Sequence, residues 1–287
     1  MTPVALRSSP VDRLADFRRV FADVVAARAD CRNGAVRDAF ARVPRHEFLG
    51  PGPWSFTERG EAASSDDPAL AYQDVALGLA RGIPTGLPSL HARCIDACAV
   101  RVGERVIHVG AGSGYYTAIL AELVGERGPV MAFEVDADLG RRARMNLSAW
   151  PWVRVETSSG VTFENASADV VYVSAGVEEL PLGWLHALEP RGRLLFPLVP
   201  AGEEGAMVLV RSIGSSTIFS AKFVCRARFL PCVGTQDDQV RSRLSDAFRR
   251  SDVDSIRSLR IEPEAPDETS WFAGRGWWLS TRLAAKR

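Results

Sequence analysis

Three glycines at alternate positions, between an apolar run and a helical pattern, constrain the fold more than any other part of the chain. The run 105–109 has the β-branched, apolar composition of a buried strand, and an apolar helical pattern covers 115–124. Gly110, Gly112 and Gly114 lie between the two. A strand, a glycine turn and a helix in this order place backbone N–H groups and a helix N-terminus beside a ligand. We therefore expect a ligand site at the end of this strand.

Strands alternate with helices from residue 100 onward, which predicts an α/β fold with a doubly wound, mostly parallel sheet. The expected strands are 105–109, 130–134, 153–156, 170–174, 193–198, 207–211 and 218–224. The expected helices between the first five are 115–124, 137–148 and 180–188. The last two strands are joined through Gly214-Ser215-Ser216 without a helix, so we expect an antiparallel hairpin at one edge of the sheet.

The regions outside the sheet predict an N-terminal cap and a C-terminal extension. Helical spacing of apolar residues predicts helices over 11–30 and 34–42, and the Pro- and Gly-rich segment 51–68 predicts a loop. After a polar stretch and a short predicted helix, 240–250, aromatic residues gather at the end of the chain: Trp271, Phe272, Trp277 and Trp278. We expect them to pack onto the domain, the alternative being a lid or a dimer contact. The predicted domains are 1–80, 81–232 and 233–287.

Composition excludes several classes of protein. Lys plus Arg and Asp plus Glu number 35 each, so no global charge attracts nucleic acid or an anionic membrane. No apolar run reaches about 18 residues, and the start lacks a signal peptide, so we expect a cytoplasmic protein. The five cysteines contain no Cys-x-x-Cys and the four histidines no metal-binding spacing. We therefore expect buried thiols and no metal site.

The order of residues after the strand discriminates between ligands. Tyr115 stands where the dinucleotide fingerprint has its third glycine, and no Gly-Lys-Ser/Thr follows, so neither a dinucleotide nor a P-loop site is expected. Glu134 ends the next strand, where a carboxylate can accept both hydroxyls of a ribose. Together these features resemble the S-adenosylmethionine-binding loop of class I methyltransferases. The resemblance implies a set of cofactor-binding residues: Gly110, Ala111, Gly112, Ser113, Gly114, Tyr115, Glu134 and Val135.

Further motifs resemble the protein-L-isoaspartate O-methyltransferase family over roughly residues 36–200. The stretch RVPRHEFLG (42–50) is similar to its Val-Pro-Arg-His-x-Phe signature, and Tyr72-Gln73-Asp74 matches its Tyr-x-Asp. Asp169–Gly176 (DVVYVSAG) resembles its Asp-x-Ile-x-Val-Thr-Ala-Ala strand, and LEPRGRLLFPLVP (188–200) resembles its Leu-x-x-Gly-Gly-x-Leu-x-x-Pro-Val segment. The resemblance implies a methyltransferase that uses S-adenosylmethionine.

The chain departs from the family in the segment 84–91, which we call the acceptor loop. The family's Thr-Ile-Ser-Gln-Pro corresponds to Pro84–Pro88, so its reactive-site serine is Gly86 here and its glutamine is Leu87. The family's Gly-Asp-Gly, whose aspartate meets the adenine, corresponds to residues 158–160, which implies Ser159 and Gly160 as cofactor contacts. His91 matches a histidine that some members place near the cofactor. These departures make isoaspartyl recognition an open question.

Methylation of a carboxylate fits the rest of the sequence. Such an acceptor is ionised at neutral pH and needs no general base, and we find neither a Ser-His-Asp set nor paired acids. The candidate catalytic positions are Thr85, Gly86, Ser89 and Ser174. The acceptor is expected to be a peptide, a modified peptide or a small molecule. Alternatives are a non-carboxylate acceptor and a catalytically silent S-adenosylmethionine-binding protein. Nucleic-acid methylation is not expected, because Ser174–Val177 lacks the Asn/Asp-Pro-Pro-Tyr/Phe pattern of amino-directed enzymes.

Overall fold

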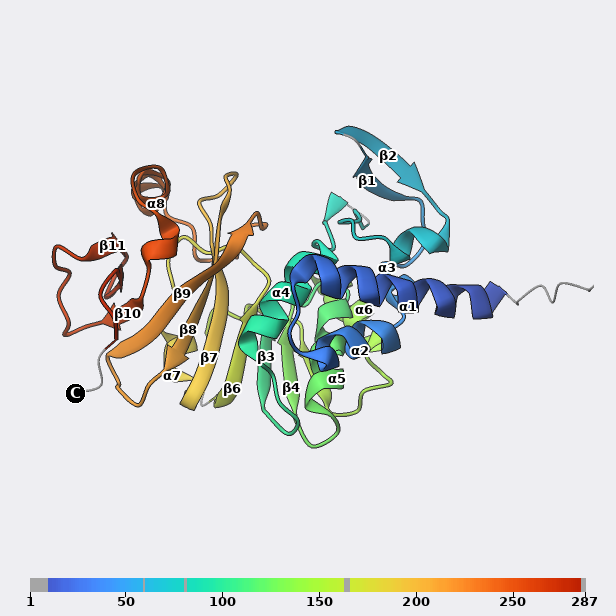
Figure 1. Ribbon diagram of the computed structural model, residues 1–287, viewed down its shortest axis with the longest axis horizontal. Coiled ribbons are helices and arrows are strands. Elements are labelled where there is room, and N and C mark those ends of the chain that lie inside the picture. The colour runs from blue at the N-terminus through green and yellow to red at the C-terminus, as the bar shows by residue number, and fades with distance from the viewer. Residues whose placement is uncertain (1–9, 59, 80–81, 163–165, 285–287) are drawn as a thin grey trace, which may run out of the picture. The chain divides into compact units, whose positions relative to one another are not determined.

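The computed structural model describes residues 10–58, 60–79, 82–162 and 166–284, without the side chains of 10–12 and 58 (Figure 1). The chain divides into two compact units, the N-terminal unit (residues 1–93) and the C-terminal unit (residues 94–287). The predicted domain boundary at 80–81 falls outside the described residues, and the predicted boundary at 232–233 stays a prediction.

Two helices form the core of the N-terminal unit, as the helical spacing predicts. They are α1 (Pro10–Ala29) and α2 (Gly34–Arg42). Phe21 of α1 packs against Phe40 of α2 and against Tyr72, with ring centroids 6.2 and 5.8 Å apart. All three side chains are buried, so they hold the unit together through apolar contact. The short helices that complete the unit are α3 (Arg45–Leu49) and the 3₁₀ helix η1 (Pro68–Tyr72).

Within the segment 51–68, residues 54–58 and 61–65 pair as strands of a β-hairpin, so the prediction of a loop is wrong for these residues. Strands β1 (Trp54–Glu58) and β2 (Glu61–Ser65) pair antiparallel, with Trp54 opposite Ser65. Pro51, Pro53 and Pro68 all lie outside the paired residues. Because proline cannot donate to a ladder, these residues bound the hairpin instead of interrupting it.

A large mixed sheet forms the C-terminal unit. Among the described residues its strand order is β11-β12-β10-β9-β8-β7-β6-β3-β4-β5. The parallel strands are β3 (Val106–Val109), β4 (Val130–Phe133), β5 (Val153–Glu156), β6 (Ala168–Val173) and β7 (Leu188–Leu198). Next to β7, β8 (Gly205–Ser212) and β9 (Ile218–Ala227) form the predicted antiparallel hairpin (Figure 1). The α/β fold with a mostly parallel central sheet is confirmed.

Helices cover both faces of this sheet. Thr117 of α5 contacts His108 of β3 on one face. On the other face, Trp184 of α7 and Leu244 of α8 belong to a buried cluster that includes Val109 of β3. The helices are α4 (Pro88–Cys98), in which the division between the units falls, α5 (Tyr115–Val124), α6 (Ala137–Asn146), α7 (Gly183–His186) and α8 (Asp238–Arg250). α7 is a single turn, shorter than the predicted helix 180–188.

The C-terminal extension continues the sheet, which the sequence analysis does not predict. After the 3₁₀ turn η3 (Val253–Ser255), its strands are β10 (Ser258–Ile261), β11 (Ser270–Ala273) and β12 (Trp277–Ser280). β10 pairs antiparallel with β9 and with β12. Trp271, Phe272 and Trp277 join the buried cluster under α8, which confirms that these aromatic residues pack onto the domain. Trp278 instead lies under the Arg260 guanidinium, 5.4 Å from its ring centroid.

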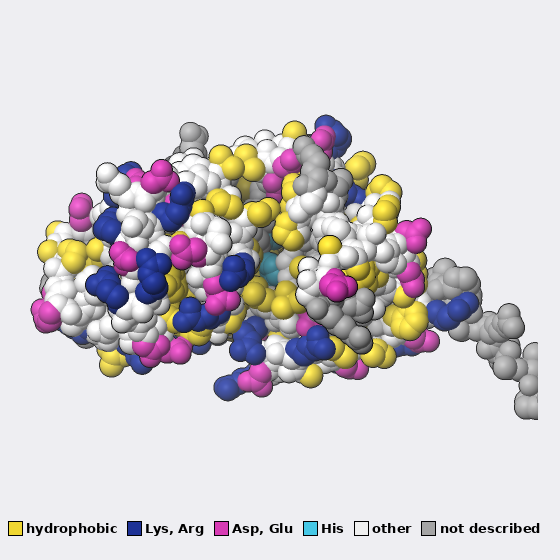
Figure 2. Space-filling view, turned by 90° about the horizontal axis from the view of Figure 1, so that it is seen from above, with side chains coloured by type: hydrophobic (Ala, Val, Ile, Leu, Met, Phe, Trp, Pro, Cys, Tyr) yellow, Lys and Arg dark blue, Asp and Glu magenta, His cyan; other side chains and the backbone are white. Residues whose placement is uncertain are grey.

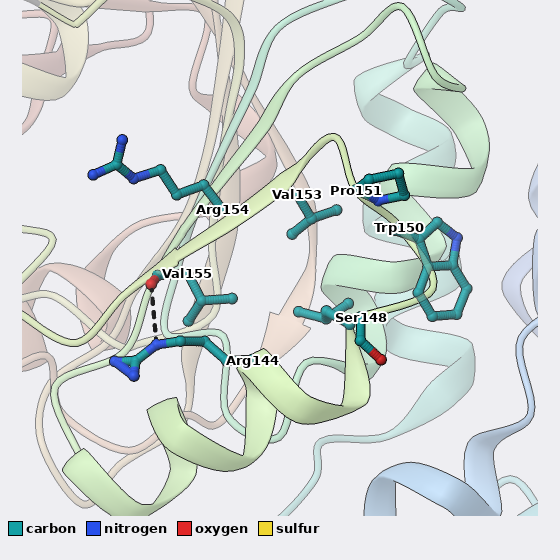
Figure 3. Close-up of a pocket in the computed structure, with 8 residues that line it drawn as sticks. Arg144, Ser148, Trp150, Pro151, Val153, Arg154 and Val155 are labelled. Carbon is teal, nitrogen blue, oxygen red and sulfur yellow. Dashed lines mark hydrogen bonds between the residues drawn. The ribbon is translucent and has the colours of Figure 1, made fainter.

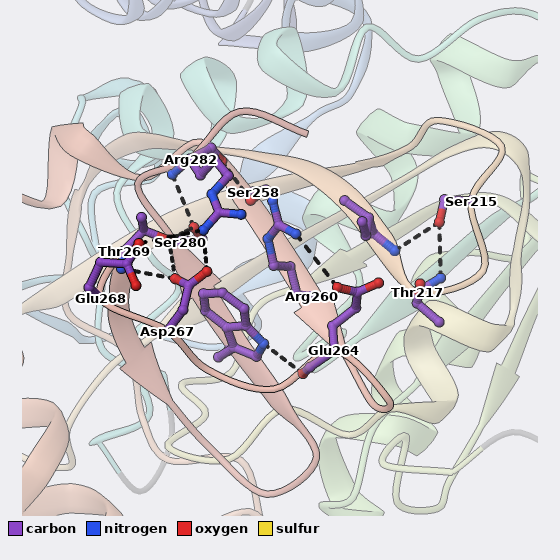
Figure 4. Close-up of polar contacts among 12 residues, drawn as sticks. Ser215, Thr217, Ser258, Arg260, Glu264, Asp267, Glu268, Thr269, Ser280 and Arg282 are labelled. Atoms are coloured by element: carbon purple, nitrogen blue, oxygen red, sulfur yellow. Dashed lines mark hydrogen bonds and ion pairs between the residues drawn. The ribbon is translucent and has the colours of Figure 1, made fainter. Parts of the chain in front are cut away.

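Polar side chains tie these last strands together (Figure 4). The Thr269 and Ser280 hydroxyls lie 2.7 Å apart, and Asp267 pairs with the Arg282 guanidinium. The Ser258 hydroxyl donates to the Arg282 carbonyl oxygen at 2.7 Å. The beginning of β10, the residues before β11 and the residues at and after the end of β12 are therefore joined to one another by polar contacts.

A buried arginine fastens α4 to the sheet. Arg193 of β7 forms a two-point ion pair with Glu104, at 2.7 and 2.8 Å, and donates to the carbonyl oxygens of Cys98 and Ala99. Both arms of the guanidinium are thus satisfied in an environment where an unpaired charge would be costly.

The surface carries both signs of charge. Figure 2 shows Lys and Arg side chains interspersed with Asp and Glu across the face in view. Within the described part of the chain, no helix has the length and apolar character needed to cross a membrane.

Candidate functional site

The glycine loop leaves β3 in a conformation that favours glycine. Gly110, Gly112 and Gly114 have φ values of +79°, +58° and +95°. The Gly110 N–H donates to the Phe133 carbonyl oxygen of β4 at 2.9 Å, which anchors the start of the loop. A Cβ atom on Gly114 would lie 2.9 Å from Leu147, whereas one on Gly112 would meet no atom within 4 Å. The end of the loop is therefore packed, and its middle faces open space.

Glu134 closes the loop from the neighbouring strand. Its side chain is buried, and its two oxygens accept hydrogen bonds from the N–H groups of Gly112, at 2.7 Å, and Asp136, at 2.9 Å. Each carboxylate oxygen can accept a second hydrogen bond, so capacity remains for hydroxyl groups of a ligand. Val135 beside it is 53% exposed. The geometry is compatible with the predicted ribose contact, which stays a prediction.

The turn at 158–161 lies against the same strand ends. A Cβ atom on Gly160 would come within 2.9 Å of Phe133 and Val109, so only glycine fits this close approach. The Gly160 carbonyl oxygen accepts a hydrogen bond from the Trp184 indole at 2.8 Å. Ser159 is exposed. The structure thus brings Ser159 and Gly160 to the edge of the sheet that carries the glycine loop.

The other predicted loop residues are buried. Ala111, Ser113 and Tyr115 are each no more than 6% exposed. The Ser113 carbonyl oxygen accepts a hydrogen bond from the Asn146 amide of α6 at 2.8 Å. Tyr115 begins α5 with its ring edge-on to Tyr116. Their side chains support the shape of the loop.

A histidine that the sequence analysis did not single out lies under this edge. His108 of β3 is fully buried, and its two ring nitrogens are hydrogen-bonded to the hydroxyls of Thr117 and Ser174. Burial lowers the pKa of His108 to about 3. A lone histidine inside an apolar strand carries no spacing signal, and its partners lie 9 and 66 residues away in the sequence.

In the N-terminal unit, Arg45 organises the segment that leads to the acceptor loop. Its guanidinium is fully buried and donates to the carbonyl oxygens of Ala71, Gln73 and Val75 at 2.9–3.1 Å. It also donates to the Thr85 hydroxyl at 3.1 Å. The arginine of the Val-Pro-Arg-His motif therefore holds backbone in place, a role that the motif alone does not reveal.

The Thr85 hydroxyl has further partners within the same unit. It accepts a hydrogen bond from the Leu77 N–H at 3.0 Å and donates to the Gly86 carbonyl oxygen at 3.3 Å. These contacts give Thr85 a structural role. Whether it also meets the methyl acceptor stays a prediction.

Gly86 and His91 fit each other closely. Gly86 has a φ of +76°, and a Cβ atom on it would stand 2.4 Å from Nε2 of His91. His91 is 2% exposed, and its N–H donates to the Leu87 carbonyl oxygen in the first turn of α4. The imidazole of His91 therefore occupies the space that any side chain at position 86 would need.

Asp74 holds the beginning of α4. One of its oxygens accepts a hydrogen bond from the Ser89 N–H at 2.8 Å, and the other pairs with Arg28 at 3.0 Å. A carboxylate at a helix N-terminus satisfies a free N–H donor and interacts favourably with the helix dipole. The aspartate of the Tyr-x-Asp motif thus positions the acceptor loop. The catalytic role predicted for Ser89 is untested.

A shallow surface pocket lies elsewhere, between α6 and the edge strand β5 (Figure 3). Arg144, Trp150 and Arg154 contribute to its lining, and the Arg144 guanidinium donates to the Val155 carbonyl oxygen. Its lining includes none of the predicted site residues.

Comparison with known proteins assigns the chain to a family. The model of the family "Protein-L-isoaspartate(D-aspartate) O-methyltransferase (PCMT)" matches residues 26–237. The chain belongs to the PCMT family. The matched range includes the glycine loop, Glu134, the turn at 158–161 and the acceptor loop, so both units contribute to the family match.

Named relatives agree with this assignment. A protein-L-isoaspartate O-methyltransferase 2 of Anaeromyxobacter sp. is 33% identical over 212 residues, 72% of this chain and 79% of the relative. A protein-L-isoaspartate O-methyltransferase of Methylorubrum extorquens is 33% identical over 208 residues, 71% and 84% of the two chains.

A solved structure agrees in fold. A crystal structure of a beta-aspartate methyltransferase (PCMT) from Plasmodium falciparum, in complex with S-adenosyl-L-homocysteine, superposes with a TM-score of 0.61 at 16% identity. The match covers 75% of this chain and 97% of that one. This PCMT family member therefore has the class I methyltransferase fold.

The structure distributes the predicted site residues over both units. Thr85, Gly86, Ser89 and His91 lie in the N-terminal unit, and the other predicted residues lie in the C-terminal unit. Among the described residues, no group of three or more His, Cys, Asp or Glu side chains could hold a metal ion. The five cysteines form no disulfide; Cys94, Cys98 and Cys232 are buried, as predicted, and Cys31 and Cys225 are half-buried.

Proposed function

We propose that this PCMT family member methylates a free carboxylate of a peptide, with S-adenosylmethionine as methyl donor and an isoaspartyl residue as the first acceptor to test. The family match over residues 26–237 carries the proposal. The related structure in complex with S-adenosyl-L-homocysteine supports the choice of cofactor.

The residues of the glycine loop fit such a cofactor. The open space at Gly112 leaves backbone accessible to a ligand, and Glu134 retains hydrogen-bonding capacity for two hydroxyls. Both features lie at the carboxyl ends of β3 and β4, where open α/β sheets bind their ligands. S-adenosylmethionine supplies an electrophilic methyl group, so the protein has to hold and orient the acceptor but need not generate a nucleophile.

The choice of a carboxylate acceptor follows from the site's chemistry. Ser174 is a half-buried residue whose backbone lies beside Gly110 and whose hydroxyl is hydrogen-bonded to His108, and burial lowers the pKa of His108 to about 3, which keeps the ring neutral at physiological pH. An ionised carboxylate needs no base, and a hydroxyl can hold it by donating a hydrogen bond. The roles of Thr85, Gly86, Ser89 and His91 toward the acceptor rest on the family resemblance alone.

The decisive experiment measures transfer of labelled methyl from S-adenosylmethionine to an isoaspartyl peptide, with the aspartyl form of the same peptide as control. We expect base-labile label on the isoaspartyl peptide alone. Label on both peptides would indicate that the acceptor loop has lost selectivity between them. If neither peptide is labelled although S-adenosylhomocysteine binds, the isoaspartyl acceptor is wrong, and small carboxylates and modified peptides become the next acceptors to assay.

A further inference from the structure

A hydrogen bond joins two neighbouring strands at the place where the order of the parallel strands changes direction. From β3 the chain adds β4 and β5 on one side, and then β6 and β7 on the other. Open α/β sheets bind ligands outside the carboxyl ends of the strands at such a switch point. His108 comes from β3 and Ser174 directly follows β6, and their Nε2 and Oγ atoms lie 3.0 Å apart.

Two hydrogen bonds and a ring contact hold His108 in place. Its Nδ1 lies 2.8 Å from the Thr117 hydroxyl of α5, and its ring packs edge-on against Tyr172 with centroids 5.4 Å apart. The imidazole, Thr117 and Tyr172 are all fully buried. A buried polar ring is costly unless both nitrogens are hydrogen-bonded, and here both are. Core packing alone would be served by an aliphatic residue, such as Val106 on the same face of the strand.

Because the ring is neutral, the roles of the two hydroxyls as donor or acceptor depend on which ring nitrogen carries the proton. In a neutral imidazole one nitrogen donates and the other accepts, so the chain Thr117–His108–Ser174 has two possible directions. If Nε2 carries the proton, it donates to Ser174 Oγ, and the Ser174 proton points away from the ring. If Nδ1 carries it, Ser174 must donate to the ring and has no proton for a ligand.

Ser174 is the one member of this hydrogen-bonded chain that is not fully buried. The residue is half-buried, and its N–H donates to the Val109 carbonyl oxygen at 2.8 Å. Its carbonyl group would lie 3.3 Å from a Cβ atom on Gly110. The backbone of Ser174 is therefore fixed next to the first residue of the glycine loop, at the switch point, and His108 holds its hydroxyl.

We propose that His108 is a positioning residue of the methyl-transfer site: its Nε2–H holds the Ser174 hydroxyl so that Ser174 donates to the acceptor carboxylate. Thr117 completes the chain by donating to Nδ1. No proton changes place during the reaction. The inference rests on the proposed function, because it assumes a carboxylate acceptor.

The first test is a double-mutant cycle on methyl transfer to the isoaspartyl peptide, with kcat and the acceptor KM measured separately. We expect Ser174→Ala and His108→Phe each to lower kcat/KM at least about tenfold, the order expected for losing one donor to a charged group. The double variant should be no worse than Ser174→Ala, because His108 acts through Ser174. Thr117→Val, which keeps the side-chain shape, should lower kcat/KM about threefold or more, because Thr117 acts on Ser174 through His108.

Controls separate positioning from general damage. Tyr172→Phe changes the same face of the sheet without interrupting the chain and should leave kcat within about threefold. The dissociation constant for S-adenosylhomocysteine should stay within about threefold in every variant. Additive losses in the cycle, or a loss of S-adenosylhomocysteine affinity that accounts for the loss of activity, would contradict the proposal.

A second measurement needs no variant. Nitrogen-15 NMR of the wild-type protein reports which ring nitrogen of His108 carries the proton. The Nε2–H tautomer is expected, and the Nδ1–H tautomer would overturn the inference even if methylation is observed. If the wild-type protein methylates no peptide, the proposed function fails, while the tautomer still decides the direction of the hydrogen-bond chain.

Discussion

At the scale of single residues, the positions that carry the family resemblance act mainly by holding backbone. Arg45 bonds three carbonyl groups, and Asp74 bonds the N–H of Ser89. The sequence identifies these residues through their motifs but not their partners, because those partners are chosen by contacts that lie 15–30 residues away. Gly86 is different, since its departure from the family pattern is visible in the sequence and its cause, the imidazole of His91, is visible only in the structure.

We expect Gly86→Ser to lower the free energy of unfolding by about 2–3 kcal/mol, because the serine needs a left-handed backbone and displaces the His91 ring. Gly82→Ser is the matched control: its φ is +72° and its Cβ atom would meet nothing within 4 Å, so about 1 kcal/mol is expected. In the double variant Gly86→Ser/His91→Ala the two losses should be less than additive. Denaturant unfolding measures the wild type, Gly86→Ser, His91→Ala, the double variant and Gly82→Ser, and strict additivity would show that the two sites do not interact.

At the scale of elements, the central strands and helices were predictable and the outer strands were not. Most of the strands β3 to β9 are separated by a helix or a glycine turn, and most are rich in β-branched or other large apolar residues. In the hairpin, β1 (Trp-Ser-Phe-Thr-Glu) has aromatic residues at alternate positions, but β2 (Glu-Ala-Ala-Ser-Ser) has a composition typical of loops, and prolines flank the pair. Strands β10 to β12 are as short as β3 to β5, but no helix separates them, so no alternation of strand and helix marks them in the sequence, and they pair mostly with one another.

The three C-terminal strands are expected to be an integral part of the sheet. Trp277 is 1% exposed and lies in the buried cluster, 5.6 Å from the Phe272 ring centroid. We expect Trp277→Ala to lower the free energy of unfolding by about 3–5 kcal/mol, the usual loss for a large buried aromatic residue. Leu283→Ala, at a side chain that is 70% exposed, should change it by less than about 0.5 kcal/mol. If Trp277→Ala lowers the free energy of unfolding, measured by thermal or denaturant unfolding, no more than Leu283→Ala does, the extension does not contribute to the stability of the fold.

At the scale of the whole molecule, the predicted cofactor contacts come from segments far apart in the sequence. Residues 110–115, 134–135 and 159–160 lie in the C-terminal unit, and His91 lies in the N-terminal unit. The strand order brings the first three segments to one edge of the sheet, which the alternation of strands and helices could predict. The role of His91 toward the cofactor stays a prediction from the family resemblance.

Hydrogen exchange of the full chain, with and without S-adenosylhomocysteine, tests all the predicted cofactor contacts in one experiment. We expect slower exchange in peptides that cover the three segments, because a bound ligand lowers the population of open states. Glu134→Ala should remove the protection and lower the affinity at least about tenfold, since a charged acceptor for two hydroxyls is lost. Glu126→Ala, at an exposed turn, should keep both the protection from exchange and the affinity for S-adenosylhomocysteine.

Each outcome of that experiment is informative. Protection of a peptide that covers 85–91 would support His91 as a cofactor contact. Unchanged affinity in Glu134→Ala would show that the ribose contact is placed wrongly.

The close fit of Gly86 and His91 also restricts how this chain could have arisen or could change. A side chain cannot enter position 86 while the imidazole of His91 fills its space. A serine gained first meets the imidazole, and a histidine lost first leaves its space empty. Both orders of change pass through the same two unfavourable intermediates. The two positions are therefore expected to covary among relatives, with a side chain at position 86 only where residue 91 leaves room for it.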